Sequence, residues 1–175
     1  VGPGLGADSI SSGKIAAIIG MMCVCIFMIA IYGVFGFLAN ISLIANLFII
    51  ISLLSLIGAT LTLPGIAGIV LTIGMAVDAN VLVFERIKEE LNKNNKFMIS
   101  VKNGFQRAIS TILDANITTL IAALLLFVFG SGPIKGFSIT LSLGVLASMF
   151  TAIMFTNFLI HLWFSFSKNK EIKLT

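Results

Sequence analysis

An unbroken run of 63 residues without Asp, Glu, Lys or Arg, from 15 to 77, constrains this chain more than any other feature. Two further uncharged runs cover 20 residues at 115–134 and 32 residues at 136–167. A helix needs ~20 apolar residues to cross a hydrocarbon core about 30 Å thick. The first run is therefore long enough for three membrane crossings and each of the others for one. This pattern argues against a water-soluble enzyme, and no enzymatic activity is predicted.

We expect five transmembrane helices in a single membrane domain that covers residues 1–175. The breaks within the first apolar run fall at 33–36 and at 58–65, where glycines and Pro64 interrupt the pattern. The predicted spans lie near 15–32, 40–59, 64–84, 110–130 and 135–163. The expected fold class is an all-α membrane protein, a bundle of five transmembrane helices with a cytoplasmic amphipathic hairpin between the third and fourth.

The eleven Lys and Arg residues are distributed unevenly around these spans. Six lie between the third and fourth spans and three follow the fifth, whereas only Lys14 and Lys135 belong to the opposite side. This nine-to-two bias follows the positive-inside rule and places the N-terminus outside and the C-terminus in the cytoplasm. The net charge of +4 therefore reflects membrane topology, and a nucleic-acid partner is not expected.

The segment after the third span is predicted to be an amphipathic continuation of that helix. Oppositely charged residues four apart mark its polar face, with Arg86 before Glu90 and Glu89 before Lys93. The asparagine-rich stretch 92–95 then breaks the helix, and a second amphipathic stretch leads into the fourth span. This hairpin is either a solvated element at the lipid headgroups or a docking surface for a cytoplasmic partner.

Two carboxylates, Asp78 and Asp114, interrupt the apolar spans. A charged aspartate near the middle of a membrane helix costs at least ~2.5–3.5 kcal/mol, so such residues usually face a protein interior or a wet cavity. From the span centres, Asp78 lies roughly 6 Å and Asp114 roughly 9 Å toward the cytoplasm, a common depth that allows them to be neighbours. An acid that is neutral when dry and charged when wet can carry a proton. The alternative is that each protonated acid merely bonds a neighbouring helix.

Polar and small residues around these acids are predicted to support them. Each aspartate opens the same tripeptide, Asp-Ala-Asn, which places Asn80 and Asn116 beside the two acids, and Thr118 follows Asp114 by one turn. Three glycines thin the third span so that another helix can approach closely, namely Gly65, Gly68 and Gly74.

The remaining reactive side chains do not form a recognisable site. His161 lies beside Trp163 near the end of the last span, where an interfacial anchor is the expected role. Cys23 and Cys25 stand two apart in an apolar helix, a geometry that excludes a disulfide between them. The sequence contains neither a Cys/His cluster with zinc spacing nor a Ser-His-Asp set, so no metal and no catalytic residue is predicted.

Several segments, read together, closely resemble the SecD branch of the SecD/SecF family of bacterial protein-export membrane proteins. One matching segment, 74–82, contains the sequence Gly-Met-Ala-Val-Asp-Ala-Asn. The other matching segments are 1–6, 61–68, 84–91, 110–123 and 132–137. The resemblance implies a membrane fold of the resistance-nodulation-division type, in which these five helices are the second to sixth of the SecD membrane part. The first helix and the large extracytoplasmic domains are expected upstream of this fragment.

The resemblance also implies a function in the bacterial cytoplasmic (inner) membrane, in contact with its lipids. Members pair with SecF, associate with the SecYEG channel, and use the proton gradient to complete the export of preproteins that SecA has pushed. In this setting Asp78 is the proton-coupling residue, whereas the role of Asp114 is open because SecF-like members carry a basic residue there. No cofactor is implied, and the coupling ion is H⁺ with Na⁺ as the alternative.

Two other functions were compared with this one. Paired intramembrane aspartates also occur in intramembrane aspartyl proteases, but the Gly-x-Gly-Asp and Pro-Ala-Leu motifs of that class are absent from the sequence. An ion-coupled exporter of lipid or small molecules on the same fold is the alternative that stays open from the sequence.

Overall fold

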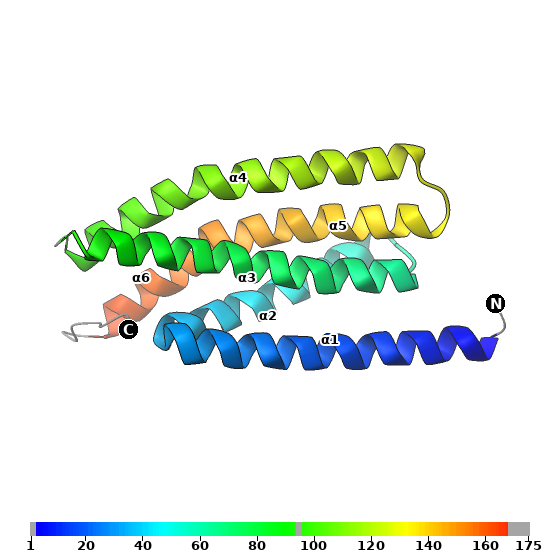
Figure 1. Cartoon of the computed structure of the whole chain (residues 1–175), viewed down its shortest axis with the longest axis horizontal. Coiled ribbons are helices and arrows are strands. Elements are labelled where there is room, and N and C mark those ends of the chain that lie inside the picture. The colour runs from blue at the N-terminus through cyan, green and yellow to red at the C-terminus, as the bar shows by residue number, and fades with distance from the viewer. Residues whose placement is uncertain (1–2, 94–95, 168–175) are drawn as a thin grey trace.

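The structure is a computed structural model that describes residues 3–93 and 96–167. Every regular element in these ranges is a helix, which confirms the predicted all-α class. In chain order the elements are α1 (Pro3–Tyr32), α2 (Val34–Leu56), α3 (Leu63–Leu91), α4 (Phe97–Phe129), α5 (Pro133–Phe150), the π-helical turn η1 (Thr151–Phe155) and α6 (Thr156–Phe166). Figure 1 shows the long helices running back and forth along one common axis.

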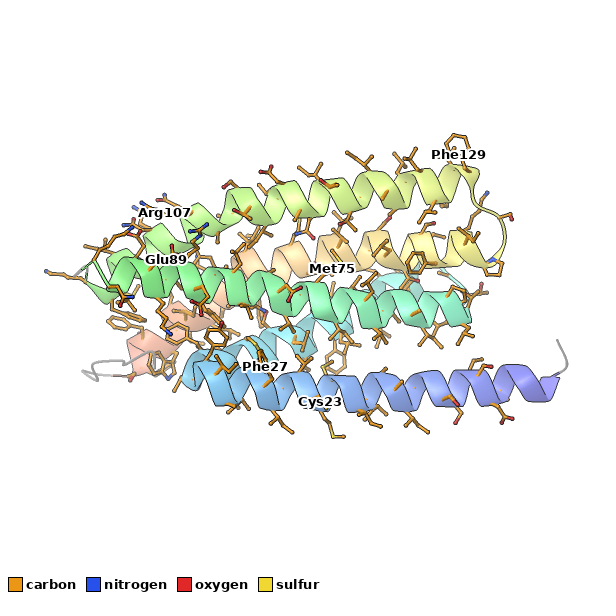
Figure 2. All side chains as sticks on the ribbon, viewed as in Figure 1. Cys23, Phe27, Met75, Glu89, Arg107 and Phe129 are labelled. Carbon is orange, nitrogen blue, oxygen red and sulfur yellow. The ribbon has the colours of Figure 1, made fainter. Side chains whose placement is uncertain are left out.

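Within the described residues, five helical stretches are long and apolar enough to cross a membrane, as predicted. They are Gly6–Tyr32, Val34–Leu56, Leu63–Leu91, Phe97–Phe129 and Pro133–Phe166, the last of which combines α5, η1 and α6. The helices extend beyond the predicted apolar spans because polar and amphipathic residues continue the same helical geometry at their ends. Large apolar side chains point outward from α1 and α4, as Figure 2 shows for Phe27 and Phe129.

The turns between the helices depend on a few special residues. Gly33 links α1 to α2 with a φ of 54°, and Gly132 precedes α5 with a φ of 48°, both in the left-handed region that favours glycine. Thr62 caps α3, since its Oγ1 accepts a 3.2 Å hydrogen bond from the Gly65 amide. The break predicted at 33–36 is narrower in the structure, where α1 ends at Tyr32 and α2 begins at Val34. Gly36 already lies inside α2, and a β-carbon there would collide with the Met28 carbonyl.

Helix α3 occupies the centre of the bundle and packs against α1, α2, α4 and α5. Its buried side chains join the main apolar core, where Phe35 of α2 meets Phe84 of α3 edge to face with ring centroids 5.5 Å apart. Helices α1 and α4 lie on opposite sides of this centre (Figure 1). The core therefore holds α3 in place while leaving the outer faces of α1 and α4 open.

Candidate functional site

Asp78 lies on α3 and lines a groove of about 180 Å³ between α3 and α4. Asp78 is exposed, and among the residues that line the groove it supplies the carboxylate. The lining residues are Met75, Asp78, Ala79 and Leu82 from α3, and Thr111, Ile112, Ala115 and Asn116 from α4. The groove brings together an acid, a hydroxyl and an amide within an otherwise apolar wall. Such a site presents a carboxylate to water or to a neighbouring polar group.

The α4 wall of this groove is fixed by a local hydrogen bond. Asn116 is buried, and its Nδ2 donates a 2.7 Å bond to the Ile112 carbonyl one turn earlier. This bond uses one of the two amide hydrogens and leaves the side-chain carbonyl to interact with other groups. The predicted support of the acid by Asn116 is thus available from α4, although the sequence pattern had paired this amide with Asp114.

Asp114 takes a different position on α4. It is exposed but does not line the groove of Asp78, because it stands two residues from both Ile112 and Asn116 and points away from their buried stripe. Thr118 is also exposed, and its Oγ1 donates to the Asp114 main-chain carbonyl at 2.9 Å. Thr118 therefore satisfies its own helix, and the structure does not bring the two aspartates into one groove.

Asn80 points into the bundle and joins α3 to α2, η1 and α6 through a buried polar network. Its Oδ1 accepts a 2.9 Å hydrogen bond from Thr156 Oγ1 at the start of α6. The same hydroxyl lies 2.9 Å from Ser42 Oγ of α2 and 2.9 Å from the Thr151 carbonyl, to which Ser42 Oγ also donates at 3.1 Å. The network connects the helix that carries Asp78 with α2 and with the η1 turn.

The sequence analysis missed this network because nothing in the pattern of the last span indicates a π-helical turn. Serines and threonines are common in membrane helices, where they often bond their own backbone. The contact between Thr156 and Asn80 spans 76 residues, so local spacing could not show it. Thr111 was missed for a similar reason, since its place in the wall of the groove depends on how α4 lies against α3.

The three glycines of α3 differ in their surroundings. A β-carbon on Gly65 would lie 3.3 Å from Thr140 Oγ1, and one on Gly68 would lie 3.3 Å from Thr140 Cβ, so both glycines face α5 closely. At Gly74, one turn before Asp78, a β-carbon would meet nothing within 4 Å. Gly74 therefore contributes open space beside the acid instead of a helix contact within this chain.

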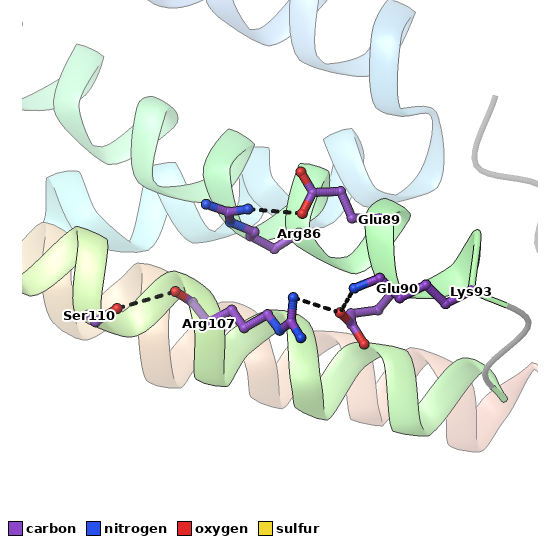
Figure 3. A network of polar contacts seen from close by, with 6 residues as sticks. All are labelled: Arg86, Glu89, Glu90, Lys93, Arg107 and Ser110. Atoms are coloured by element: carbon purple, nitrogen blue, oxygen red, sulfur yellow. Dashed lines mark hydrogen bonds and ion pairs between the residues drawn. The ribbon is translucent and has the colours of Figure 1, made fainter.

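A cluster of charges joins α3 and α4 beyond the groove, at the end of the bundle where the two helices meet (Figure 3). Glu90 is buried, and its Oε1 lies 2.7 Å from Lys93 Nζ and 3.3 Å from Arg107 Nη1. Asn103 Nδ2 donates to the other carboxylate oxygen at 3.3 Å. The hydrogen bond from Lys93 lowers the pKa of Glu90 below its usual range, and Asn103 and Arg107 act in the same direction.

Two of the ion pairs at this junction join residues that are three apart in the sequence. Arg86 Nη1 contacts Glu89 Oε2 at 2.9 Å on an exposed face, and Lys93 contacts Glu90. The sequence had predicted partners four apart, whereas in the structure Glu90 lies against Lys93 and against Arg107 of α4. In the described part of the chain, no group of three His, Cys, Asp or Glu side chains is arranged to hold a metal ion.

Comparison with known proteins places the whole chain in one family. The family model described as "Protein export membrane protein SecD/SecF, C-terminal" matches residues 1–166. The protein translocase subunit SecD of Rickettsia prowazekii is 58% identical over 174 residues, which are 99% of this chain and 34% of that protein. The SecD subunit of Desulfurispirillum indicum is 61% identical over 156 residues, 89% of this chain and 30% of the relative.

The fold matches a solved structure equally well. The crystal structure of SecDF, a translocon-associated membrane protein from Thermus thermophilus, superposes with a TM-score of 0.93 and 43% sequence identity. The match covers 97% of this chain and 24% of that one. The chain thus spans about a third of the length of the curated relatives it matches. On its sequence and its fold, the chain belongs to the SecD/SecF family of protein-export membrane proteins.

Proposed function

We propose that this chain is the membrane part of a SecD-type subunit that couples ion movement to protein export, with Asp78 as the coupling group. The observation that carries the proposal is the position of Asp78, an exposed carboxylate in a groove within an apolar span. Proton binding neutralises the acid and favours a dry environment, whereas release favours a wet one. Ion occupancy at Asp78 therefore selects between two arrangements of α3 and its neighbours.

The energy available from an ion gradient suits such a switch. One charge that crosses ~100 mV releases ~2.3 kcal/mol. A free-energy difference of this size changes the ratio of two conformational states about fiftyfold. The coupling ion in the proposal is H⁺, with Na⁺ as the alternative. The subunit acts as a transport component and not as an enzyme, and it requires no cofactor.

The proposed partners follow from the family. SecF supplies a second membrane half that faces Asp78, SecYEG supplies the channel, and SecA drives the earlier part of translocation. Preproteins are handled by extracytoplasmic domains of the longer protein, which is an integral protein of the bacterial inner membrane. The charged junction of α3 and α4 faces the cytoplasm in this proposal, because nine of the eleven basic residues lie on that side.

Export by the full-length protein with its partners tests the proposal. Asp78→Asn keeps the size of the side chain but holds it in a permanently uncharged form. We expect this variant to assemble and to support SecA-driven export, while the stimulation of export by the ion gradient is lost. Asp78→Glu should retain part of the stimulation because it keeps a titrating group. Full gradient stimulation in Asp78→Asn would contradict the coupling role.

A further inference from the structure

Asn46 is a polar residue near the centre of α2 whose side chain has no hydrogen-bond partner among the described residues. The side chain is fully buried, and neither Nδ2 nor Oδ1 is within bonding reach of a described polar atom. A buried polar group left unpaired costs about 1–3 kcal/mol. Because α2 is a membrane-spanning helix, bulk water does not relieve this cost along its apolar length.

The neighbours of Asn46 on the same face of α2 show which surface it meets. Ser42, one turn earlier, donates to the Thr151 carbonyl at 3.1 Å, and Ile50, one turn later, packs in a cluster with Ala147. Ala147 and Thr151 are themselves one turn apart on α5 and η1. Asn46 therefore lies opposite the short segment between Ala147 and Thr151, where the helix passes into its π-helical turn.

Protein groups on this segment are already engaged with one another. Thr151 Oγ1 shares its one hydrogen between the Ala147 carbonyl at 3.1 Å and the Ser148 carbonyl at 3.2 Å. The Thr151 carbonyl accepts from Ser42 Oγ, and it also lies 2.9 Å from Thr156 Oγ1, whose single hydrogen is shared with Asn80 Oδ1. The hydroxyl oxygens nevertheless keep lone pairs that can accept further hydrogen bonds. A small molecule that both donates and accepts can thus connect them to the Asn46 amide.

We propose that Asn46, Ser42 and Thr151 form an internal water-binding site between α2 and the η1 turn. Water is the ligand that fits, because the named groups are neutral and supply both donors and acceptors, and buried waters typically make about three such bonds. The site is separate from the groove of Asp78, since none of its three residues lines that groove.

A structure of the full-length protein with its partners, at a resolution that shows ordered water, tests this site. We expect a water molecule about 3 Å from Asn46 Oδ1 or Nδ2 and within reach of Ser42 or Thr151. Asn46→Leu should lose this water. Asn46→Ser, a smaller change that keeps a polar side chain, is the second variant if Asn46→Leu does not fold, and it should retain the water. The matched control is Ser138→Ala, which removes a buried hydroxyl that bonds its own helix at Lys135 and should leave the water in place.

Two results would overturn the proposal. The first is an Asn46 amide that contacts only protein atoms in the wild-type protein. The second is a water that persists at the same place in Asn46→Leu, which would show that Asn46 does not hold it. Neither result depends on ion coupling at Asp78, so the test of the water site is independent of the test of the proposed function.

Discussion

Asp78 and Asn80 stand two residues apart on α3 and point to opposite sides of it, because an α-helix turns about 100° per residue. Asp78 lines the open groove toward α4, whereas Asn80 bonds Thr156 within the bundle. Asn80 therefore links the helix that carries Asp78 directly to α6, and under the proposed function a shift of α3 on ion binding would reach α6 through this contact. The repeated Asp-Ala-Asn tripeptide on α4 has a different use, since its amide and not its acid reaches the groove.

Replacement of Asp114 is predicted to be mild. Asp114→Asn should keep most gradient-stimulated export, because Asp114 lies outside the groove of Asp78 and the amide preserves size and hydrogen bonding. The measurement is the export assay of the full-length protein, with Asp78→Asn run in parallel. An Asp114→Asn protein as inactive as Asp78→Asn would show instead that the two acids function as a pair.

At the residue scale, the sequence predicted the acid but not all of its surroundings. Asp78 stood out because a carboxylate in an apolar span is costly and therefore rare. Thr111, Ser42 and Thr156 did not stand out, since hydroxyl residues are unremarkable in membrane helices and their contacts depend on tertiary packing. The openness beside Gly74 also depends on where the other helices lie, which local spacing does not determine.

At the scale of elements, the close approach of α3 and α4 depends on Gly104. A β-carbon at this position would lie 2.6 Å from Ile87 Cγ1 and 2.8 Å from the Ile87 amide nitrogen. The backbone atom cannot move aside as a flexible side chain can, so the two helices must separate. This contact lies between the charged cluster at Glu90 and the groove of Asp78, and it sets the spacing of both.

Gly104→Ala should destabilise the protein by about 1–3 kcal/mol through overpacking. Gly20→Ala is the matched control, since Gly20 lies in α1 with nothing within 4 Å of its position and Ala favours a helix. Thermal unfolding of the purified full-length protein should show a lower midpoint for Gly104→Ala and an unchanged or higher one for Gly20→Ala. Equal midpoints for both variants would contradict the close α3–α4 contact.

The buried Glu90 gives the α3–α4 junction a pH dependence of known sign. Lys93 lowers its pKa in the folded state, so its ionised form stabilises the junction fully above the ordinary value of about 4.3. This contribution declines as the pH falls below that value and is lost once the pH passes the lowered folded pKa. We expect backbone protection of 84–93 and 96–107 against hydrogen exchange, corrected for intrinsic rates, to fall over that acidic range.

Glu90→Gln should weaken this protection near neutral pH and remove most of its acid dependence. Glu89→Gln is the matched control, because Glu89 pairs with Arg86 on an exposed face where an ion pair is worth little. Unchanged acid dependence in Glu90→Gln would assign the effect to another group.

The number and class of the helices followed from the sequence because uncharged length alone decides how many crossings are available. Helix ends were less predictable, since α1, α3 and α4 continue through polar residues that a hydropathy argument excludes. The η1 turn had no signal in the sequence at all. It is a tertiary feature, stabilised by the hydroxyls of Ser42 and Thr156 at the Thr151 carbonyl.

At the scale of the whole molecule, the chain has two dissimilar ends. The basic residues from Arg86 to Arg107 lie at the end of α3 and the start of α4. Lys14 lies in the first half of α1 and Lys135 at the start of α5, and both of these helices begin at the opposite end of the bundle (Figure 1). The exposed faces of α1 and α4 are largely apolar, as expected for helices that meet lipid or a second membrane half. Under the proposed function, the orientation of these ends decides from which side an ion would reach Asp78.

Labelling of single cysteines tests the orientation. In a protein in which Cys23 and Cys25 have been replaced, Lys102→Cys should react with a membrane-impermeant thiol reagent only from the cytoplasmic side. Lys135→Cys should react only from the outside, and both positions are exposed on the protein surface. Labelling of Lys102→Cys from outside would invert the topology and with it the direction of ion movement.

Ion movement through the reconstituted complex tests the central claim, the coupling role of Asp78, most directly. Full-length protein with its partners is placed in sodium-free vesicles, and a proton gradient is imposed while a dye reports the internal pH. The account predicts proton movement in the wild type and in Asp114→Asn, and its loss in Asp78→Asn. Proton movement in Asp78→Asn at the wild-type rate would contradict the account, because it would show that protons pass without this carboxylate.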